Sequence, residues 1–453
     1  MTVRIGLEIH VYLKTHSKLF CACSARFLEA PAPNTQVCAL CTGQPGAKPM
    51  GVNAEALRLG LQVAQALGCT LMPGVRFQRK HYFYPDSPAN YQRTATPHGT
   101  NGSLEGVRIR ELHWEEDPGA YDLREGTVDY NRAGAPLLEI VTEPDLRDPA
   151  HARAFLAELR FLLDHLDANY EAAGLKADVN VSVPGGERVE VKNVNGLRNV
   201  ETAIDHEVAR QTEAISRGEP VGRETRHFDE VRGVTTRLRT KEEEADYRYM
   251  EDPDLPWLPL PPALLSETLL PEAPLARRTR FETAFGLARA EATTLLRERS
   301  LADAFEALAS TLPPAAVAEF LQRDLRGELH ARGLTFTASG ISVAELTALL
   351  SGLGARSITP QVATRLLRER LDFGRSLVEG VRAEAAEKGT AEQAVGEAVV
   401  AALAENPKAV EDYRAGKATA LNFLVGAVMK RLKGRAAPDV VRAAVEAGLG
   451  NLR

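Results

Sequence analysis

The chain changes character near residue 275, and this change constrains its fold more than any single motif does. Before it, apolar and polar residues often alternate with the two-residue period of β-strands. After it, alanine and leucine dominate and that alternation largely disappears, as expected of helices. Seven prolines between residues 253 and 274 mark a stiff connector where the two parts meet. We therefore expect an α+β protein whose β-rich part precedes an all-α part.

At 453 residues the chain is too long for one ordinary hydrophobic core. We expect an amino-terminal cradle domain built on a largely antiparallel β-sheet (1–275), an all-α helical domain (276–395) and a small α-helical tail domain (396–453). No apolar run approaches the length of a membrane span, and the amino terminus begins with a strand-like pattern instead of a signal peptide. These features predict a cytoplasmic protein without a membrane partner.

Residues 3–12 alternate regularly between apolar and polar side chains, which predicts a strand with one buried face. Glu8 and His10 then lie side by side on the other face. A carboxylate and an imidazole placed in this way can converge on one cation or one substrate group. An ordinary ion pair on a solvated strand would show the same pattern.

A single carboxylate, Glu139, interrupts the apolar segment 137–141. In a central strand this charge must be neutralised, hydrogen-bonded or held against a cation, because a bare buried charge is very unfavourable. Glu139 is therefore a candidate metal ligand or catalytic group. If the strand lies at the edge of a sheet, Glu139 simply faces water.

Two further segments predict strands with polar faces. In 109–117, Glu115 shares its face with His113, while the acids Glu116 and Asp117 are expected to face solvent. A predicted hairpin over 178–192 presents a second group of polar side chains, Asp178, Asn180, Glu190 and Lys192. A half-solvated antiparallel sheet without any function would present the same faces.

Four cysteines form two close pairs, Cys21-x-Cys23 and Cys38-x-x-Cys41. This spacing suits a tetrahedral zinc site in a reducing compartment. Such a site is closed to substrate, so the zinc would be structural. The alternative is four reduced thiols packed in a core.

The segment Arg79–Arg93 is rich in aromatic, basic and proline residues and has no helical or strand period over its length. It predicts a surface loop that recognises a polar ligand. Aromatic residues beside proline can also serve only to hold a loop in place.

The net charge of −6 excludes a protein that is basic over its whole surface, so a nucleic-acid partner requires a local basic patch. Residues 404–435 offer one, with seven basic and three acidic side chains. Favourable placement of lysines at a helix end would explain part of this excess. The seven basic side chains, which are candidate contacts to a nucleic-acid phosphate backbone, are Lys408, Arg414, Lys417, Lys430, Arg431, Lys433 and Arg435.

The sequence has no Walker-type phosphate loop, dinucleotide-binding glycine motif or Gly-x-Ser-x-Gly motif. It resembles instead, across nearly its whole length, the B subunit of the tRNA-dependent aspartyl/glutamyl-tRNA amidotransferase. The resemblance rests on IGLEIHVYLKTHSKLFC (5–21), NTQVCALC (34–41), YFYPD (82–86), HWEED (113–117), VDYNRAGAPLLEIVTEPD (128–145), ADVNVSV (177–183), VEVKNVNG (189–196), DYRYMEDPDLP (246–256) and ENPKAVEDYRAGK (405–417).

The resemblance implies a carbon–nitrogen ligase that uses glutamine as amide donor. Such enzymes use ATP and magnesium to phosphorylate the side-chain carboxylate of Asp or Glu on a misacylated tRNA, and ammonia then displaces the phosphate. The residues that match the family's magnesium-centred catalytic site are Glu8, His10, Glu115 and Glu139. Those expected to line the same cradle, toward ATP or the acyl end, are Asp178, Asn180, Glu190 and Lys192.

The resemblance also implies a heterotrimer, in which an amidase-like A subunit makes the ammonia and a small C subunit fastens the other two together. The helical tail would grip the tRNA. Two different interpretations stay open from the residues alone: a zinc-stabilised tRNA-binding protein without chemistry, and a scaffold that only docks partner subunits.

Two family lysines are missing here. The usual Pro-Lys-Gly-Tyr-Gln is Pro-Ala-Asn-Tyr-Gln at 88–92, and the usual Glu-Glu-Asp-Ala-Gly-Lys is Glu-Glu-Asp-Pro-Gly-Ala at 115–120. Nucleotide contacts near Ala89 and Ala120 must therefore differ. Some family members lack the cysteine pairs, which agrees with zinc as scaffold.

Overall fold

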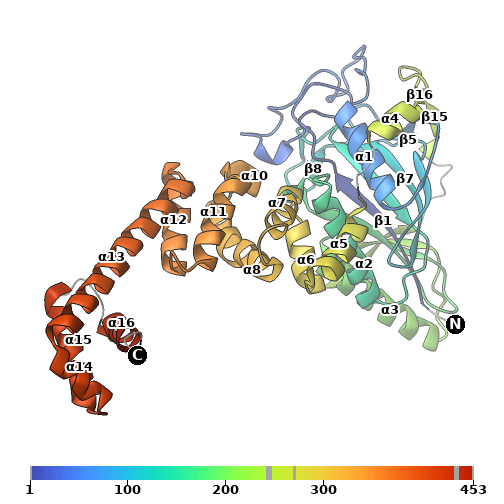
Figure 1. Cartoon of the computed structure of the whole chain (residues 1–453). Coiled ribbons are helices and arrows are strands. Elements are labelled where there is room, and N and C mark those ends of the chain that lie inside the picture. The colour runs from blue at the N-terminus through green and yellow to red at the C-terminus, as the bar shows by residue number, and fades with distance from the viewer. Residues whose placement is uncertain (1–2, 241–246, 269–271, 433–437, 451–453) are drawn as a thin grey trace. The chain divides into compact units, whose positions relative to one another are not determined.

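The computed structural model describes residues 3–240, 247–268, 272–432 and 438–450 (Figure 1). The chain forms two compact units, Met1–Arg299 and Ser300–Arg453. The first unit carries the sheets and the second is helical, so the α+β prediction is confirmed. The expected division at 275 falls inside the first unit, because helices α5 (Pro274–Phe285) and α6 (Arg289–Leu296) contact α2 (Pro149–His165).

A 12-stranded sheet dominates the first unit, with the order β14-β13-β12-β11-β1-β10-β7-β5-β4-β15, while β2 and β6 lie off this path. All neighbours are antiparallel except β12 and β13. The strands are β1 Arg4–Tyr12, β2 Thr70–Leu71, β4 Phe77–His81, β5 Tyr91–Ala95, β6 Gly99–Leu104, β7 Val107–Glu116, β10 Pro136–Thr142, β11 Leu175–Ser182, β12 Val189–Asn195, β13 Glu224–Asp229, β14 Val234–Thr240 and β15 Met250–Glu251.

Smaller elements complete this unit. Two short ribbons pair β3 (Gly74–Val75) with β16 (Leu258–Pro259) and β8 (Ala120–Asp122) with β9 (Thr127–Asp129). The remaining elements are the 3₁₀ turns η1 (Phe27–Glu29) and η2 (Glu171–Ala173) and the helix α4 (Pro262–Glu267).

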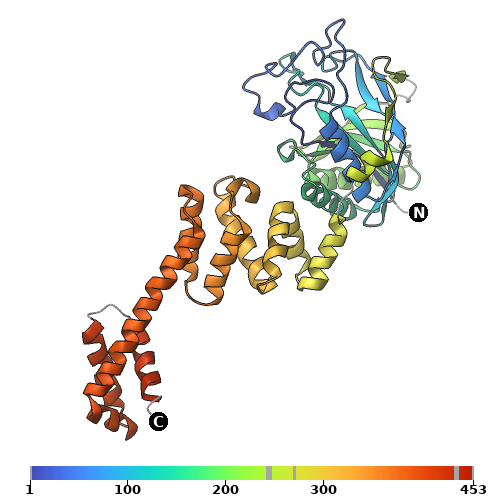
Figure 2. The ribbon, with the colours of Figure 1, turned by 45° about the horizontal axis from the view of Figure 1, so that its top comes forward.

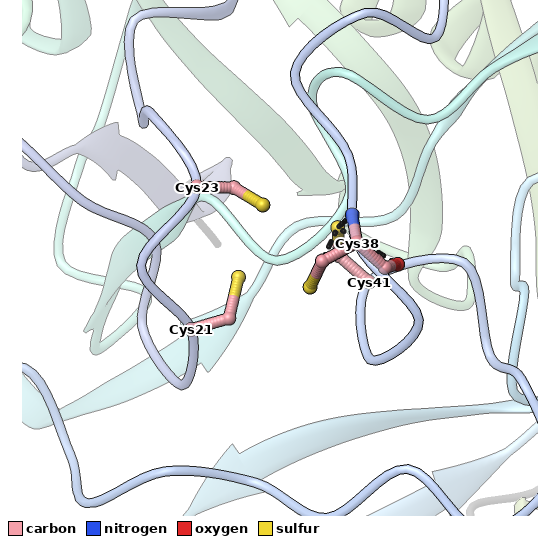
Figure 3. A group of neighbouring side chains, drawn as sticks. All are labelled: Cys21, Cys23, Cys38 and Cys41. Atoms are coloured by element: carbon pink, nitrogen blue, oxygen red, sulfur yellow. Dashed lines mark hydrogen bonds between the residues drawn. The ribbon is translucent and has the colours of Figure 1, made fainter.

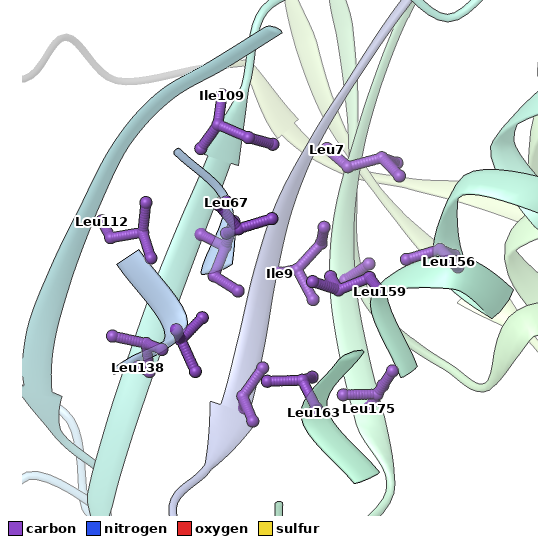
Figure 4. Packing of buried hydrophobic residues seen from close by; sticks show 14 of the residues in the cluster. Leu7, Ile9, Leu67, Ile109, Leu112, Leu138, Leu156, Leu159, Leu163 and Leu175 are labelled. Atoms are coloured by element: carbon purple, nitrogen blue, oxygen red, sulfur yellow. The ribbon is translucent and has the colours of Figure 1, made fainter. Parts of the chain in front are cut away.

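One face of the sheet is apolar and packs against helices α1 (Ala54–Ala66), α2 and α3 (Leu197–Ser216). Leu7 and Ile9 of β1, Leu138 of β10, and Leu159 and Leu163 of α2 all belong to this core (Figure 4). Burying each such side chain stabilises the fold by about 1.5–3 kcal/mol. The other face of the same strands is therefore left to carry polar groups.

Two of these helices begin at a polar residue that caps the first turn. Asn53 caps α1 by accepting hydrogen bonds from the backbone N–H of Glu55 and Ala56. Asp148 caps α2 by accepting one from His151, with Pro149 at the first helical turn.

The prediction that Arg79–Arg93 is a loop throughout is wrong at both ends. Arg79 lies in β4 and Arg93 in β5, directly opposite each other, and only the residues between these strands connect them. Two opposed cations are tolerated because Asp252 lies between them, 2.9 Å from Arg79 Nη2 and 2.7 Å from Arg93 Nε. The sequence of these strands shows no regular alternation of apolar and polar residues, because Arg79 and Arg93 are held in the sheet by polar contacts.

In the described residues, the second unit consists of helices and one π-helical turn. They are α7 Arg299–Ala309, α8 Pro314–Glu319, the π-helical turn η4 Phe320–Leu325, α9 Arg326–His330, α10 Phe336–Ser339, α11 Val343–Gly354, α12 Pro360–Phe373, α13 Leu377–Glu405, α14 Pro407–Arg414, α15 Ala418–Leu432 and α16 Pro438–Gly450.

Helix α13 runs unbroken for 29 residues, so the boundary expected at 395 falls within it (Figure 2). Its later part, from Val395 onward, packs with α14, α15 and α16 in a separate hydrophobic core. In the part of the chain that the structure describes, no helix combines the length and the apolar character needed to cross a bilayer.

Asp252 offers a test of how the edge of the sheet is held. Its side chain is fully buried between two arginines, and breaking a buried ion pair costs about 3–5 kcal/mol. We expect Asp252→Asn to lower the thermal unfolding midpoint of the first unit strongly. The matched control is Glu251→Gln, which removes only an exposed pair with Arg76 and should cost at most about 1 kcal/mol. Equal shifts in the two variants would contradict the anchoring role.

Candidate functional site

The polar face of the sheet is assembled by strand register. His10 of β1 lies opposite Glu139 of β10, which lies opposite His113 of β7. On the other side of β1, Glu8 lies opposite Asp178 of β11. Side chains directly opposite in an antiparallel pair stand close enough to interact. The register therefore brings segments that are far apart in sequence into one row.

His10, Glu115 and Glu139 form the first group, here called the His10 cluster, and their candidate ligand atoms lie within 4.8 Å of one another. His10 Nε2 is 3.7 Å from Glu139 Oε2. Because β10 lies between β1 and β7, Glu139 is in a central strand, and the edge-strand alternative is excluded. One imidazole and two carboxylates at this spacing can hold a divalent cation.

His113 is a member of this site that the sequence-based selection missed. Its Nε2 is 3.0 Å from Glu139 Oε2 and 3.9 Å from Glu115 Oε2. Burial alone would lower the pKa of His113, but the Glu139 carboxylate raises it to about 9. Conversely, burial opposes the charge on Glu139, yet His113, His10 and Lys80 hold the pKa of Glu139 well below its usual range. The shared strand face with Glu115 was the signal that could have identified His113.

The hairpin of β4 and β5 folds two more polar groups over Glu115. Gln92 Nε2 donates a hydrogen bond to Glu115 Oε1. Burial disfavours the charged form of Lys80, but Glu115 and Glu139 raise the pKa of Lys80 above its ordinary value. Lys80 therefore supplies a fixed positive charge next to the two carboxylates. The sequence indicated only the segment Arg79–Arg93 as a whole and did not single out Lys80 or Gln92, because their positions depend on the hairpin.

Glu8 belongs to a second group, the Glu8 cluster, formed with Asp178 and Glu190; their candidate ligand atoms also lie within 4.8 Å of one another. The structure groups Glu8 with Asp178 and Glu190, and not with His10, Glu115 and Glu139. Two residues along a strand are separated by about 7 Å of backbone. Register then pairs Glu8 with Asp178, whereas His10 pairs with Glu139.

The Glu8 cluster is only partly neutralised by its surroundings. Lys192 Nζ lies 2.5 Å from Asp178 Oδ2 and 2.9 Å from Glu190 Oε1, and Asn180 Nδ2 donates to Glu8 Oε1 at 3.1 Å. Burial, which is only partly offset by Lys192, raises the pKa of Glu8. Three carboxylates against one ammonium leave an excess of negative charge that a cation would balance.

A cavity of about 1070 Å³ in the first unit opens onto both clusters, because His10, Glu115, Asp178 and Lys192 all line it. Its volume is sufficient for a nucleotide-sized ligand. The remaining polar lining includes the cations Lys80, Arg132 and Lys176 and the aromatic side chains Tyr12, Tyr82, Tyr84 and Tyr247.

The acids Glu116 and Asp117 do not face solvent, so that prediction is wrong. Asp117 accepts a hydrogen bond from the Tyr12 hydroxyl at 2.8 Å and pairs with Arg132 at 2.7 Å. Glu116 pairs with Arg93 at 3.2 Å. Both acids are held by arginines from other segments, which the local sequence could not reveal. Asp117 thereby fixes Arg132 on the wall of the cavity.

The four cysteines converge from two separate loops, with their sulfur atoms within 4.8 Å of one another (Figure 3). A hydrogen bond from Cys21 and the nearby ammonium of Lys18, 3.4 Å from Cys41 Sγ, lower the pKa of Cys41 to about 4. Thiolate is the form that binds metal, and four sulfurs at this spacing fit tetrahedral zinc. The zinc prediction is thus compatible with the geometry.

The described residues among the expected tRNA contacts lie on α14, on α15 and in the turn between them. Lys408, Arg414, Lys417, Lys430 and Arg431 are all exposed. Lys417 pairs with Asp412 at 2.7 Å, and Arg431 pairs with Glu405. Lys433 and Arg435 lie outside the described residues. The charge available to a partner is therefore smaller than the sequence count suggested.

Metal analysis tests the cysteine site directly. We expect about one zinc per chain, the content of a single four-cysteine site, in protein purified without chelator, and loss of that zinc in Cys21→Ser. The matched control is Cys69→Ser, which removes the cysteine outside the cluster and should keep the metal. Elemental analysis that finds no zinc in the unsubstituted protein would contradict the assignment.

Comparison with known proteins gives the family. Residues 3–266 match the GatB/GatE catalytic domain, and residues 303–449 match the GatB domain. The B subunit of the aspartyl/glutamyl-tRNA(Asn/Gln) amidotransferase from Methanothermobacter thermautotrophicus is 43% identical over 444 residues, which cover 96% of this chain and 98% of that protein. The protein of the same name from Thermus thermophilus is 42% identical over 469 residues, with 98% of each chain covered. Because both parts of the chain match and the relatives align nearly end to end, this chain belongs to the family of aspartyl/glutamyl-tRNA amidotransferase B subunits.

Proposed function

We propose that this chain activates the side-chain carboxylate of Asp on tRNA(Asn), of Glu on tRNA(Gln), or of both, by ATP-dependent phosphorylation. Ammonia from a glutaminase subunit then displaces the phosphate and forms Asn-tRNA(Asn) or Gln-tRNA(Gln). The observation that carries the proposal is the pair of buried acidic clusters at one large cavity. Phosphoryl transfer depends mainly on positioning and charge neutralisation, which this arrangement can supply.

The His10 and Glu8 clusters would each hold a magnesium ion, which would supply charge neutralisation to the transferred phosphoryl group. In this proposal Glu139, His10 and Glu115 form one site and Glu8, Asp178 and Glu190 the other. Asn180 fixes the carboxylate of Glu8, and Lys192 forms ion pairs with Asp178 and Glu190. These residues act by holding charge in fixed positions on strands.

Other cations of the cavity would meet the phosphates of ATP. Lys80, Arg132 and Lys176 line it, and all three come from strands or from segments anchored to them. They can provide positive charge where Ala89 and Ala120 replace the family's loop lysines. Arginine and lysine both bind phosphate oxygens through charge-assisted hydrogen bonds.

The assembly follows from the same proposal. An amidase-like A subunit would supply ammonia and a small C subunit would join it to this chain, which would act in the cytoplasm. Exposed Lys408, Arg414 and Lys430 on the tail would contact the tRNA backbone. A zinc-stabilised tRNA-binding protein without chemistry would have no use for two buried clusters of carboxylates.

Glu139→Gln in the assembled complex tests the catalytic proposal. The substitution removes one charge from the His10 cluster, and loss of such an electrostatic group costs about 100-fold or more in rate. We expect ATP-dependent amide formation on Asp-tRNA and Glu-tRNA to fall accordingly, while filter binding of tRNA is retained. Glu125→Gln, on the exposed turn between β8 and β9, is the control and should keep full activity. Equal product from Glu139→Gln and the unsubstituted complex would refute the catalytic role.

Lys408→Gln tests the tail. Removing one phosphate contact should weaken tRNA binding about equally for different sequences and reduce the slope of log affinity against log salt by about 1. Arg365→Gln, also on the second unit but paired with Glu369 and Glu384, should leave that slope unchanged. An unchanged slope in Lys408→Gln would remove this residue from the tRNA surface.

A further inference from the structure

A second, much smaller recess of about 110 Å³ lies on the polar face of the sheet and includes Glu8. Strands β1, β7, β10 and β11 contribute to its walls, and the residue just before β12 completes it. The side chains that matter for its chemistry are Arg4, Arg110, Arg188, Glu8, Asn180 and Ser182. The proposed function assigns no role to the three arginines.

The recess has an excess of positive charge. Three guanidinium groups line it against one carboxylate, and that carboxylate, Glu8, already accepts a hydrogen bond from Asn180. Within the described ranges, the side chains of Arg4 and Arg188 have no hydrogen-bond or ion-pair partner, and Arg188 Nε is buried without one. A buried donor without a partner is unfavourable, so Arg188 Nε would gain a hydrogen bond with an anion in the recess, and the exposed guanidinium of Arg4 adds positive charge beside it.

The position of Arg110 depends on an irregularity in β7. Ile109 and Leu112 both enter the hydrophobic core, although a regular strand would place them on opposite faces. The register of β7 against β10 shifts between Val141 and Thr142, and this shift leaves Arg110 as the extra residue. A β-bulge of this kind redirects a side chain. Here the bulged residue, Arg110, is one of the residues that line the recess.

A neighbouring arginine shows how these groups differ from ordinary surface cations. Arg108, also on β7, donates two hydrogen bonds to Asp145, at 2.8 and 2.7 Å, and does not line the recess. The nearest acid to Arg110 is the adjacent Glu111, at 3.8 Å. Arg108 is satisfied within the protein, whereas the arginines of the recess are available to a ligand.

We infer that this recess binds a single phosphate group. Guanidinium groups match phosphate oxygens in charge and geometry, and the volume suits one tetrahedral oxyanion and excludes a nucleoside. The inference rests on the proposed function, since Glu8 would place a phosphoryl-transfer site next to the recess. The phosphate belongs either to the phosphate chain of the nucleotide or to the free inorganic phosphate that ammonia displaces.

Calorimetric titration of the full chain with inorganic phosphate and, separately, with ADP tests this site, with magnesium present in both cases. Arg188→Gln and Arg110→Gln each remove a guanidinium of the recess, and Arg108→Gln is the matched control on the same face. We expect the dissociation constant for inorganic phosphate to rise about tenfold in the first two variants and to stay within about twofold in the control.

The ADP titration distinguishes the two sources. An equal loss of ADP affinity assigns the recess to the phosphate chain of the nucleotide, and unchanged ADP affinity assigns it to free phosphate. The inference is overturned if the unsubstituted chain binds neither anion, if affinities are insensitive to Arg188 and Arg110, or if Arg108→Gln weakens binding as much. Arg110 is largely exposed, so its variant keeps the test valid should Arg188→Gln fail to fold. Neither titration requires tRNA or ammonia, so a failure of amide formation would leave this result standing.

Discussion

The antiparallel register of β1 between β10 and β11 is the constraint on which the site depends. It sets His10 opposite Glu139 and Glu8 opposite Asp178, while Ile9 and Ile140 enter the core from the reverse face. A slip of one residue would expose the core face and bury the acids in its place. Hydrophobic packing and the polar site therefore specify the same register, and neither can change alone.

This register also explains why so many carboxylates can be buried. A bare charge in such a position would be very unfavourable, but three of the acids have a cation at close range: His113 lies beside Glu139, and Lys192 lies beside Asp178 and Glu190. In the Glu8 cluster the negative charge is only partly neutralised, because the single ammonium of Lys192 faces three carboxylates. An incompletely neutralised acidic cluster in a folded protein is a suitable place for a metal cation, since the ion removes the remaining repulsion.

Sequence reasoning was sufficient where one strand decides the outcome. Alternation alone placed Glu8 and His10 on one face and Glu115 with His113, and it identified Glu139 as an acid within an apolar strand. It was insufficient where the partner comes from elsewhere in the chain. It did not show that Glu8 groups with Asp178 and Glu190, and it placed Glu116 and Asp117 in solvent because Arg93 and Arg132 lie in other segments. The alternation of residues along one strand shows on which face of the sheet a side chain lies. The side chains next to it are known only once the pairing with other strands is known.

The loops that carry the cysteines contact a segment that forms part of the cavity wall. Asn34 forms hydrogen bonds with the backbone of Val128 and Tyr130. The Tyr130 hydroxyl donates a hydrogen bond to the carbonyl of Pro85, in the connection between β4 and β5. Gly43, two residues after Cys41, adopts a φ of +66°, and a Cβ there would lie 2.1 Å from the carbonyl oxygen of Pro88. Only glycine permits this approach. The cysteine-bearing segment is thus packed against the connection between β4 and β5, part of which lines the cavity, and the position of each restrains the other.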